Sequence, residues 1–598
     1  MDDTAFFAES ATFADTHVKL RDMMNRNGGA FEWSADHNSR FEVTKFALVD
    51  FSRAKDIPRP PIILRQTVID PTPAHKFLGV YFDQELRWHR HVDYTVSKAS
   101  RWISLFKRIT RSRSGLPLQL LRRLYIAVAV PKITYAADVW YTPIRTPGAR
   151  KRKSGSVGAT NRLTRAQRQA ALAITGCFRT TATDFVEAHA NLLPIEFLLE
   201  DLCFRAYTRM VAIDDKTHPI YRIVKHLQSR PAKRHPSPIH ILDRLFKLEQ
   251  GSVAPPLLHS LEDVKHVLYR CAIADSREKS IDEEANSRAN YKVYTDGSKV
   301  DGGVGASAVM LDTAERKWST LKRHLGSETD HTIYDAELVG ILMAVHMVGQ
   351  IPANATVAVF SDNQSTLQAI TKPPDGPAGH IVLHINNAMR ALSTRRPVLT
   401  RNLRFHWISS HSGVYGNELA DRAAKEAAKG ATSPDRDLPP VLAVPFPRSS
   451  TAIWTTYKEE VDKKWMSAFA KTPRGVRLLR IDRNFHPRRY YKLVKGLHRS
   501  QTSIINQMRS GHAALNVYLH RIKRREDPFC EHCPQSKETV RHYVLECPAR
   551  RETRRTTLDP LGRHARDLSH LLSTTSGITA LCKFISASGR FTVREGVG

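Results

Sequence analysis

The sequence predicts a multidomain protein with an α/β fold, a mixed sheet with flanking helices, over residues 291–430 and largely helical parts on either side. Between 291 and 430, short apolar runs of strand length alternate with longer runs of helical spacing. Outside that range helical spacing dominates, and segments rich in Gly, Pro, Ser, Lys or Arg interrupt it. The length of 598 residues suggests roughly three to five domains.

Several strands and two long helices are expected in the central α/β segment. Tyr291–Asp296 alternates as a strand, and Gly297 and Ser298 are predicted to end it in a turn. The remaining elements are predicted as strands at 304–311, 356–361 and 403–408 and as helices at 332–348 and from about 417 onward.

The flanking parts are expected to be mainly helical. Residues 77–82 are predicted as a buried strand, and residues 84–109 and 116–130 as helices. The Gly-, Lys- and Arg-rich stretch 146–165 is predicted as a linker or a flexible loop. The predicted regions are 1–145, a helical connection and linker at 146–290, the α/β domain at 291–430, a linker at 431–450, and a basic helical tail at 451–598.

The charge balance favours a polyanionic partner. Lys and Arg number 91 against 59 Asp and Glu, which gives a formal net charge of +32. Neutralising phosphates releases counterions, so nucleic acid is the expected partner. The alternatives are a basic surface without a partner and disordered basic tails. The sequence leaves the oligomeric state open.

The cysteine content and the hydropathy indicate an intracellular protein, nuclear or cytoplasmic, that is neither secreted nor membrane-bound. Seven cysteines in 598 residues do not form a disulfide scaffold. The acidic start MDDTAFFAES does not have the pattern of a secretory signal. The longest apolar run, 124–130, is too short to span a bilayer.

Four acidic residues stand where the predicted elements can bring them together. Asp296 and Asp362 lie at or near strand ends, and Glu337 and Asp421 lie on helices that can pack over the sheet. Clustered carboxylates repel one another unless divalent cations neutralise them, and oxygen ligands suit Mg²⁺ or Mn²⁺. Two such ions about 4 Å apart can clamp the attacking and leaving oxygens of a phosphoryl displacement.

Four segments that contain these acids resemble type 1 ribonuclease H in order, spacing and local context. They are YTDGS (294–298), DAEL (335–338), FSDNQ (360–364) and HWISSHSGVYGNELADRAAKEA (406–427). The resemblance implies a ribonuclease H-like sheet and cleavage of the RNA strand of an RNA–DNA hybrid.

The same resemblance implies roles for individual residues. The four acids match residues that bind two Mg²⁺ or Mn²⁺ ions, and His411 matches a loop histidine that assists proton transfer and product release. The positions that match substrate-binding residues are Gly297, Ser298 and Asn363. A longer basic segment that grips the hybrid in some members is absent from 371–380.

Other interpretations of these residues remain open at this point. Asp362 could cap the helix that follows it, Asp421 could complement a helix N-terminus, and His411 could be an ordinary loop histidine. The rival function is a non-enzymatic nucleic-acid-binding protein that keeps the ribonuclease fold without turnover.

The N-terminal third resembles the C-terminal palm and thumb of a non-LTR retrotransposon reverse transcriptase. The segments FEWSADHNSRFEVTKFALVDFSR (31–53) and KFLGVYFDQELRW (76–88) carry this resemblance. It implies that Asp2 and Asp3 are the paired acids of a palm hairpin whose upstream partners are missing. We therefore expect a truncated remnant of a retroelement polyprotein without polymerase activity.

Three cysteines and one histidine near the C-terminus have the spacing of a zinc site. The pattern is Cys530-x2-Cys533-x8-His542-x4-Cys547, which supplies four ligands for tetrahedral Zn²⁺. It resembles the Cys/His knuckle that follows the polymerase in many non-LTR elements, and flanking Arg and Lys residues could contact RNA or target DNA. A helix with chance cysteines is the alternative.

Overall fold

The computed structural model describes the chain except for residues 1–3, 40, 55, 111–114, 147–151, 230–235, 256–269, 375 and 592–598. The chain divides into two compact units. Residues 1–200 and 464–598 together form the first unit, and residues 201–463 form the second. The predicted roles of Asp2 and Asp3 lie outside the described residues and stay predictions.

A six-stranded mixed sheet forms the centre of the 201–463 unit. The strand order is β5-β10-β9-β6-β7-β8, in which the first four strands are parallel and β7 and β8 are antiparallel to their neighbours. The strands are β5 Cys271–Ala272, β6 Tyr291–Val300, β7 Gly303–Asp312, β8 Lys317–Ser327, β9 Val357–Ser361 and β10 Leu403–Trp407.

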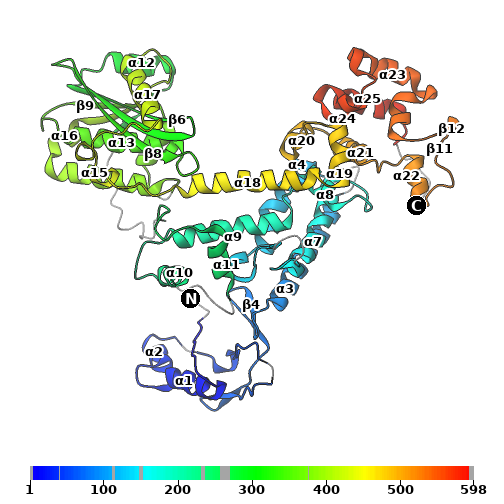
Figure 1. Ribbon diagram of the computed structural model, residues 1–598, viewed down its shortest axis with the longest axis horizontal. Coiled ribbons are helices and arrows are strands. Elements are labelled where there is room, and N and C mark those ends of the chain that lie inside the picture. The colour runs from blue at the N-terminus through cyan, green and yellow to red at the C-terminus, as the bar shows by residue number, and fades with distance from the viewer. Residues whose placement is uncertain are drawn as a thin grey trace. The chain divides into compact units, whose positions relative to one another are not determined.

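Helices cover both faces of this sheet (Figure 1). On one face α13 packs with Val293, Val359 and Phe405 in the larger core, and on the other α17 packs with Tyr294 and Phe360. This confirms the predicted α/β fold. The helices of the unit are α10 Pro219–Ser229, α11 Pro238–Phe246, α12 Arg277–Ala285, α13 Ile333–Val348, α14 Gln364–Ile370, α15 Gly379–Arg395, α16 Pro397–Asn402 and α17 Tyr415–Ala428.

The predicted turn at Gly297 and Ser298 is wrong. Strand β6 pairs with β7 along its whole length, up to the pair Val300↔Gly303. The turn lies instead at Asp301 and Gly302, which both have positive φ. Strand β8 was not predicted from the sequence at all.

Two predicted linkers contribute to the folded unit. Within the predicted connection and linker at 146–290, β5 adds a strand beside β10, and α12 follows it. In the predicted linker 431–450, Leu438, Leu442 and Phe446 are buried in the larger core because they pack beside α13 and α15.

The other unit is mainly helical, with three two-stranded sheets. Its N-terminal part contains α1 Phe13–Asn25, α2 Ala30–Asp36, β1 Ile62–Leu64, β2 Thr67–Ile69, β3 Ala74–Phe77, β4 Val80–Asp83, α3 His89–Ile109, α4 Leu118–Leu124, a π-helical turn Tyr125–Ala129, α5 Val130–Ile133, α6 Ala137–Trp140, α7 Val157–Thr175 and α8 Thr183–Ala190. Its C-terminal part contains α19 Pro473–Ile481, α20 Pro487–Leu493, α21 Arg499–Ser510, α22 Asn516–Arg521, β11 Phe529–Cys530, β12 Cys533–Lys537, a π-helical turn His542–Glu546, α23 Arg551–Thr557, α24 Leu568–Ser573 and α25 Thr575–Ser588. Helices α9 Ile195–Val211 and α18 Ser450–Ala470 contain the boundaries between the units.

Two sequence predictions for this unit are wrong. Residues 77–82 form a hairpin rather than one strand, because Leu78 and Gly79 both adopt positive φ between β3 and β4. The predicted linker 146–165 is shorter than expected, since α7 begins at Val157. No helix in the described ranges combines the length and hydropathy needed to cross a bilayer.

Distant parts of the chain form one core in this unit. Side chains from 99–192 and from 465–494 are buried together. Arg499, at the start of α21, is buried and donates to the carbonyls of Ala173 and Ile174 at the end of α7. Asn506 also donates to Thr175 O (2.8 Å), so α21 caps the C-terminus of α7.

Candidate active site

The strand register brings Asp296 and Asp362 side by side. The parallel strands β6 and β9 pair up to Thr295↔Ser361, and each aspartate is the next residue. Asp296 lies inside the long strand β6, whereas Asp362 directly follows the end of β9. The prediction that parallel neighbours bring these two acids together therefore holds, although Asp296 does not end its strand.

Helix α13 presents Glu337 to this pair through an unusually close approach to β6. A Cβ added at Gly297 would lie 2.6 Å from the backbone N of Glu337. One added at Gly340 would lie 2.9 Å from Ser307 O. The helix starts at a capping box in which Thr332 and Asp335 satisfy each other's backbone N–H groups, which fixes its first turn.

Asp296, Glu337 and Asp362 form one cluster of carboxylates. One oxygen of each lies within 4.8 Å of the others. Asp296 is only 7% exposed and Glu337 only 5%. Glu337 Oε2 is buried and accepts no hydrogen bond from any residue that the structure describes. Three converging carboxylates, one of which has an oxygen without a donor among the described residues, fit a hard divalent cation such as Mg²⁺.

Burial and mutual repulsion hold protons on this cluster in the absence of a cation. Burial, and then the charges of Asp362 and Asp421, raise the pKa of Asp296 to about 8. Burial, and then Asp296 and Asp362, raise the pKa of Glu337 well above its ordinary value. The pKa of Asp362 is also raised, mainly by burial. A divalent cation would reverse this balance because it favours the ionised carboxylates.

Asp421 and His411 lie at the margin of the cluster. Asp421, on α17, is not among the three acids that share the 4.8 Å limit in the described chain, but its charge raises the pKa of Asp296. It forms an ion pair with Lys425 (2.8 Å), one turn later on α17. His411 is exposed in the loop after β10, with φ +51°, and its charge lowers the pKa of Asp362.

Lys425 is a residue of the site that the sequence interpretation missed. Its charge acts on Asp296 as well as on Asp421, and it lowers the pKa of Asp296. The i,i+4 spacing from Asp421 could have indicated this pair.

The predicted substrate-binding residues have structural contacts of their own. Asn363 caps α14, because its side-chain oxygen accepts from the backbone N of Ser365 (3.0 Å) and Thr366 (3.3 Å). Asn363, rather than Asp362, is therefore the helix cap. Ser298 is 8% exposed within β6, and Gly297 allows the approach of α13. Their contacts with substrate stay predictions.

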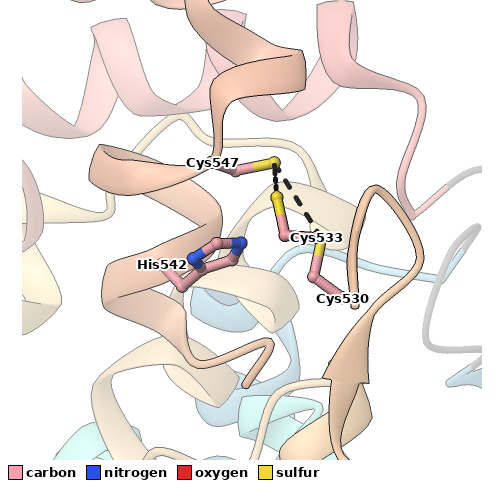
Figure 2. A group of neighbouring side chains, drawn as sticks. All are labelled: Cys530, Cys533, His542 and Cys547. Atoms are coloured by element: carbon pink, nitrogen blue, oxygen red, sulfur yellow. Dashed lines mark hydrogen bonds between the residues drawn. The ribbon is translucent and has the colours of Figure 1, made fainter. Parts of the chain in front are cut away.

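The four predicted zinc ligands gather in the C-terminal part of the other unit. Figure 2 shows the thiols of Cys530, Cys533 and Cys547 facing the ring of His542. One ligand atom from each lies within 4.8 Å of the others. Cys530 and Cys533 face each other across the β11–β12 pair, and His542 and Cys547 come from the π-helical turn and the residue after it.

The geometry and the chemistry of these four side chains fit a zinc ion. The Sγ of Cys547 lies 3.9 Å from the Sγ of both Cys530 and Cys533. Two thiolates bound at about 2.3 Å in a tetrahedron stand about 3.8 Å apart. His542 Nε2 is buried and has no hydrogen-bond partner among the residues that the structure covers. Burial and the neighbouring thiols raise the pKa of Cys533 to about 11, so a cation is needed to keep the thiolates together.

Some basic residues next to this cluster have structural roles. Arg550 is buried over the ring of Tyr543, 4.8 Å from its centroid, and donates to Ser588 O. Lys523 and Arg524 are exposed before β11, where they are accessible to a polyanion.

Comparison with known proteins identifies the family of the central α/β domain. The ribonuclease H family model matches residues 288–429, so this part of the chain is an RNase H domain. The chain is 23% identical over 163 residues to Ribonuclease H from Thermosynechococcus vestitus, a match that covers 25% of this chain and 96% of the relative.

The chain is also homologous to polyproteins of non-LTR retrotransposons. It is 31% identical over 121 residues to the retrovirus-related Pol polyprotein from type-1 retrotransposable element R1 4 of Nasonia vitripennis, covering 20% of this chain and 28% of that protein. It is 25% identical over 147 residues to the RNA-directed DNA polymerase from mobile element jockey of Drosophila funebris, covering 24% of this chain and 15% of that protein. The chain thus spans less than a third of either relative.

Among solved structures, the chain is similar to the N-terminal RNase H domain of rv2228c from Mycobacterium tuberculosis. The match covers 23% of this chain and 98% of the solved chain. The identity is 19% and the TM-score 0.19.

Proposed function

We propose that this protein is a metal-dependent endonuclease that hydrolyses the RNA strand of RNA–DNA hybrids, within a retroelement-derived polyprotein. The observation that carries the proposal is the buried cluster of Asp296, Glu337 and Asp362, one oxygen of which makes no hydrogen bond within the described chain. The RNase H match over 288–429 and the homology to retrotransposon polyproteins support it.

The three clustered acids, together with Asp421, would hold two Mg²⁺ or Mn²⁺ ions. Asp296, which lies beside the other acids, would help to hold both ions, with Glu337 and Asp362 as ligands of one and Asp421 as a ligand of the other. When bound, such ions activate water for attack on phosphorus and stabilise the leaving oxygen.

The remaining residues of the site orient the acids and move protons. Lys425 holds Asp421 beside the cluster through its ion pair. His411, which is exposed and whose charge acts on Asp362, would donate a proton to the 3′-oxygen of the RNA when the P–O bond breaks. The products would be an RNA with a 3′-hydroxyl and one with a 5′-phosphate.

Asp362→Asn tests the nuclease. It removes a charge from the cluster but keeps the shape, so we expect cleavage of a labelled RNA–DNA hybrid in Mg²⁺ to fall by at least about a hundredfold. Hybrid binding, measured by fluorescence anisotropy, is expected to remain. Asp435→Asn, at an exposed position, serves as the control.

Two results would contradict this proposal. Cleavage that survives Asp362→Asn would show that the cluster is not the active site. A wild-type protein that binds hybrid but does not cut it would favour the rival function, a nucleic-acid-binding protein with an inactive ribonuclease fold.

We further propose that the Cys/His cluster binds one structural Zn²⁺ ion. The convergence of three thiols with an imidazole nitrogen that lacks a hydrogen bond within the described chain supports this (Figure 2). The ion would stabilise the small module that presents Lys523 and Arg524 to RNA or target DNA.

Metal analysis tests the zinc site. We expect one zinc per chain in the purified wild type, and loss of that zinc in Cys533→Ser, because three ligands bind zinc more weakly than four. Cys582→Ala, at a buried cysteine in the same unit, is the control and should keep the zinc. A folded wild type that contains no zinc would rule the site out.

A further inference from the structure

Helix α12 lies before the matched RNase H range and is attached to the sheet by polar contacts. Glu284, near its end, accepts from Tyr294 OH (2.5 Å) and Lys292 Nζ (2.9 Å), both on β6. The preceding strand β5 pairs in parallel with β10 at the edge of the sheet. Strand β5 and helix α12 thus form an extension that is fixed to the sheet at both ends.

The start of α12 contacts the loop that follows β10. Arg277 donates through Nε to Ser409 Oγ (2.7 Å) and through Nη2 to Ser410 O (3.1 Å). Ser280 Oγ accepts from the backbone N of Ser409 (3.1 Å) and donates to Arg277 O (2.7 Å). Ser280 and Ser409 are both buried, so these bonds hold the first residue of the loop from two sides.

The loop held in this way carries His411. Ser412 Oγ donates to Ser409 O (2.6 Å), which closes the loop on its anchored residue. His411 has a left-handed backbone, at φ +51°, and Gly413 has φ +76°. A non-glycine residue in this conformation requires support from its surroundings. The contacts with Arg277 and Ser280 supply such support from outside the loop.

The loop also stands next to the carboxylate cluster. Ile408 N donates to Ser361 O (3.0 Å), and Trp407 Nε1 donates to Asp362 O (3.0 Å). A shift of Ser409 would therefore move His411 relative to Asp362.

We propose that Arg277 and Ser280 are positioning residues, which hold the 409–413 loop so that the His411 imidazole faces the carboxylate cluster. This inference rests on the proposed nuclease function for its catalytic consequence, but the anchoring itself does not. The competing possibility is that the exposed guanidinium of Arg277 contacts a phosphate of the hybrid directly.

Amide hydrogen exchange of the full chain, followed by mass spectrometry, tests the anchor without any activity measurement. In Arg277→Ala we expect exchange in peptides that cover 409–413 to be at least about fivefold faster, since two hydrogen bonds from a cation are lost. Lys279→Ala is the matched control. It removes a positive charge from the same helix, and Lys279 forms its ion pair with Asp275 rather than with the loop. Ser280→Ala should speed exchange at Ser409 as well. Unchanged loop exchange in both Arg277→Ala and Ser280→Ala would overturn the proposal.

A double-mutant cycle with His411→Ala tests the catalytic consequence. If Arg277 acts through His411, Arg277→Ala lowers kcat on a labelled hybrid by roughly tenfold with little change in KM, and has no further effect in the His411→Ala background. If Arg277 contacts phosphate instead, KM rises in Arg277→Ala, and the losses of activity from Arg277→Ala and His411→Ala multiply in the double variant. That result would contradict the positioning role. If the wild type does not cut hybrid, the proposed function fails, and the exchange experiment alone decides whether α12 anchors the loop.

Discussion

At the scale of single residues, the carboxylates of the candidate active site repel one another when no metal is bound. Asp296 and Glu337 are buried beside each other and beside Asp362, and Lys425 is the cation that lowers the pKa of Asp296. One lysine at the margin does not balance three carboxylates. The folded chain is therefore expected to keep protons on them until a cation binds.

This repulsion predicts a specific dependence of stability on pH. The pKa of Asp296 is raised to about 8 in the fold, so the stability that this group contributes is complete below its ordinary pKa of about 4. That stability is lost as the pH rises through about 8. In EDTA, Asp296→Asn should unfold at about the wild-type temperature at pH 4 and about 3–5 °C higher at pH 8. Differential scanning fluorimetry at both pH values measures this difference.

Added Mg²⁺ provides the control for this prediction. At pH 8 it should raise the unfolding temperature of the wild type and have little effect on Asp296→Asn, because the variant has lost a central ligand. An Asp296→Asn protein that is less stable than the wild type in EDTA at pH 8 would show that the carboxylates do not repel each other as described.

At the scale of elements, the site depends on how closely α13 approaches β6. In Gly297→Ala the added Cβ would lie 2.6 Å from the backbone N of Glu337, which is too close for two non-bonded atoms. The helix must therefore move away from the strand. We expect a loss of about 1–3 kcal/mol in the stability of the 201–463 unit, measured by chemical denaturation, and weaker Mg²⁺ binding because Glu337 moves with the helix.

Gly376→Ala is the matched control for this substitution. A Cβ at Gly376 meets nothing within 4 Å, and the residue lies outside the left-handed region. Its stability should stay within about 0.5 kcal/mol of the wild type. A Gly297→Ala protein with wild-type stability and Mg²⁺ affinity would show that the close contact is not needed.

The elements that the sequence predicted well are those with a strong local pattern. Strand β9 is an apolar run followed by an acid, and the cysteine ligands follow a short fixed spacing. Strand β8 (KWSTLKRHLGS) was missed because Lys, Arg and His interrupt its alternation. Helix α12 (REKSIDEEA) has no apolar stripe, and the polar contacts of Glu284 attach it to the sheet.

Gly297 shows why local patterns are not enough for the site. A glycine followed by a serine is typical of a turn, and the sequence interpretation placed one there. The reason for the glycine is instead a long-range contact with α13, about forty residues later, which no local pattern reveals. That these three acids gather could be inferred from the sequence, whereas the close packing of helix on strand that brings Glu337 to Asp296 and Asp362 could not.

At the scale of the whole molecule, the chain forms one unit from two segments that are far apart in the sequence. Residues 1–200 and 464–598 belong together, and the RNase H domain lies between them in the sequence. The sequence suggested a separate helical connection and a separate basic tail. Nothing local could have joined them, because the contacts between α7 and α21 link residues more than 300 positions apart.

Arg499 joins the two segments of this unit directly. Its guanidinium is buried and donates to the carbonyls of Ala173 and Ile174, which α7 itself leaves unpaired at its end. Arg499→Met keeps much of the side-chain volume but leaves these carbonyls without their donor, at a cost of about 2–4 kcal/mol. Because the bond joins both segments, we expect faster amide exchange in α7 and α21 together, measured by mass spectrometry.

The comparison with an exposed arginine separates this effect from a simple loss of charge. Arg480→Met, on the exposed side of α19 in the same unit, should leave exchange in both helices unchanged. Exchange in β6 and β9 of the RNase H domain should also stay as in the wild type, since these strands belong to the other unit. Faster exchange confined to α21 in Arg499→Met, with α7 unaffected, would mean that the two segments are stable independently and that the buried arginine does not couple them.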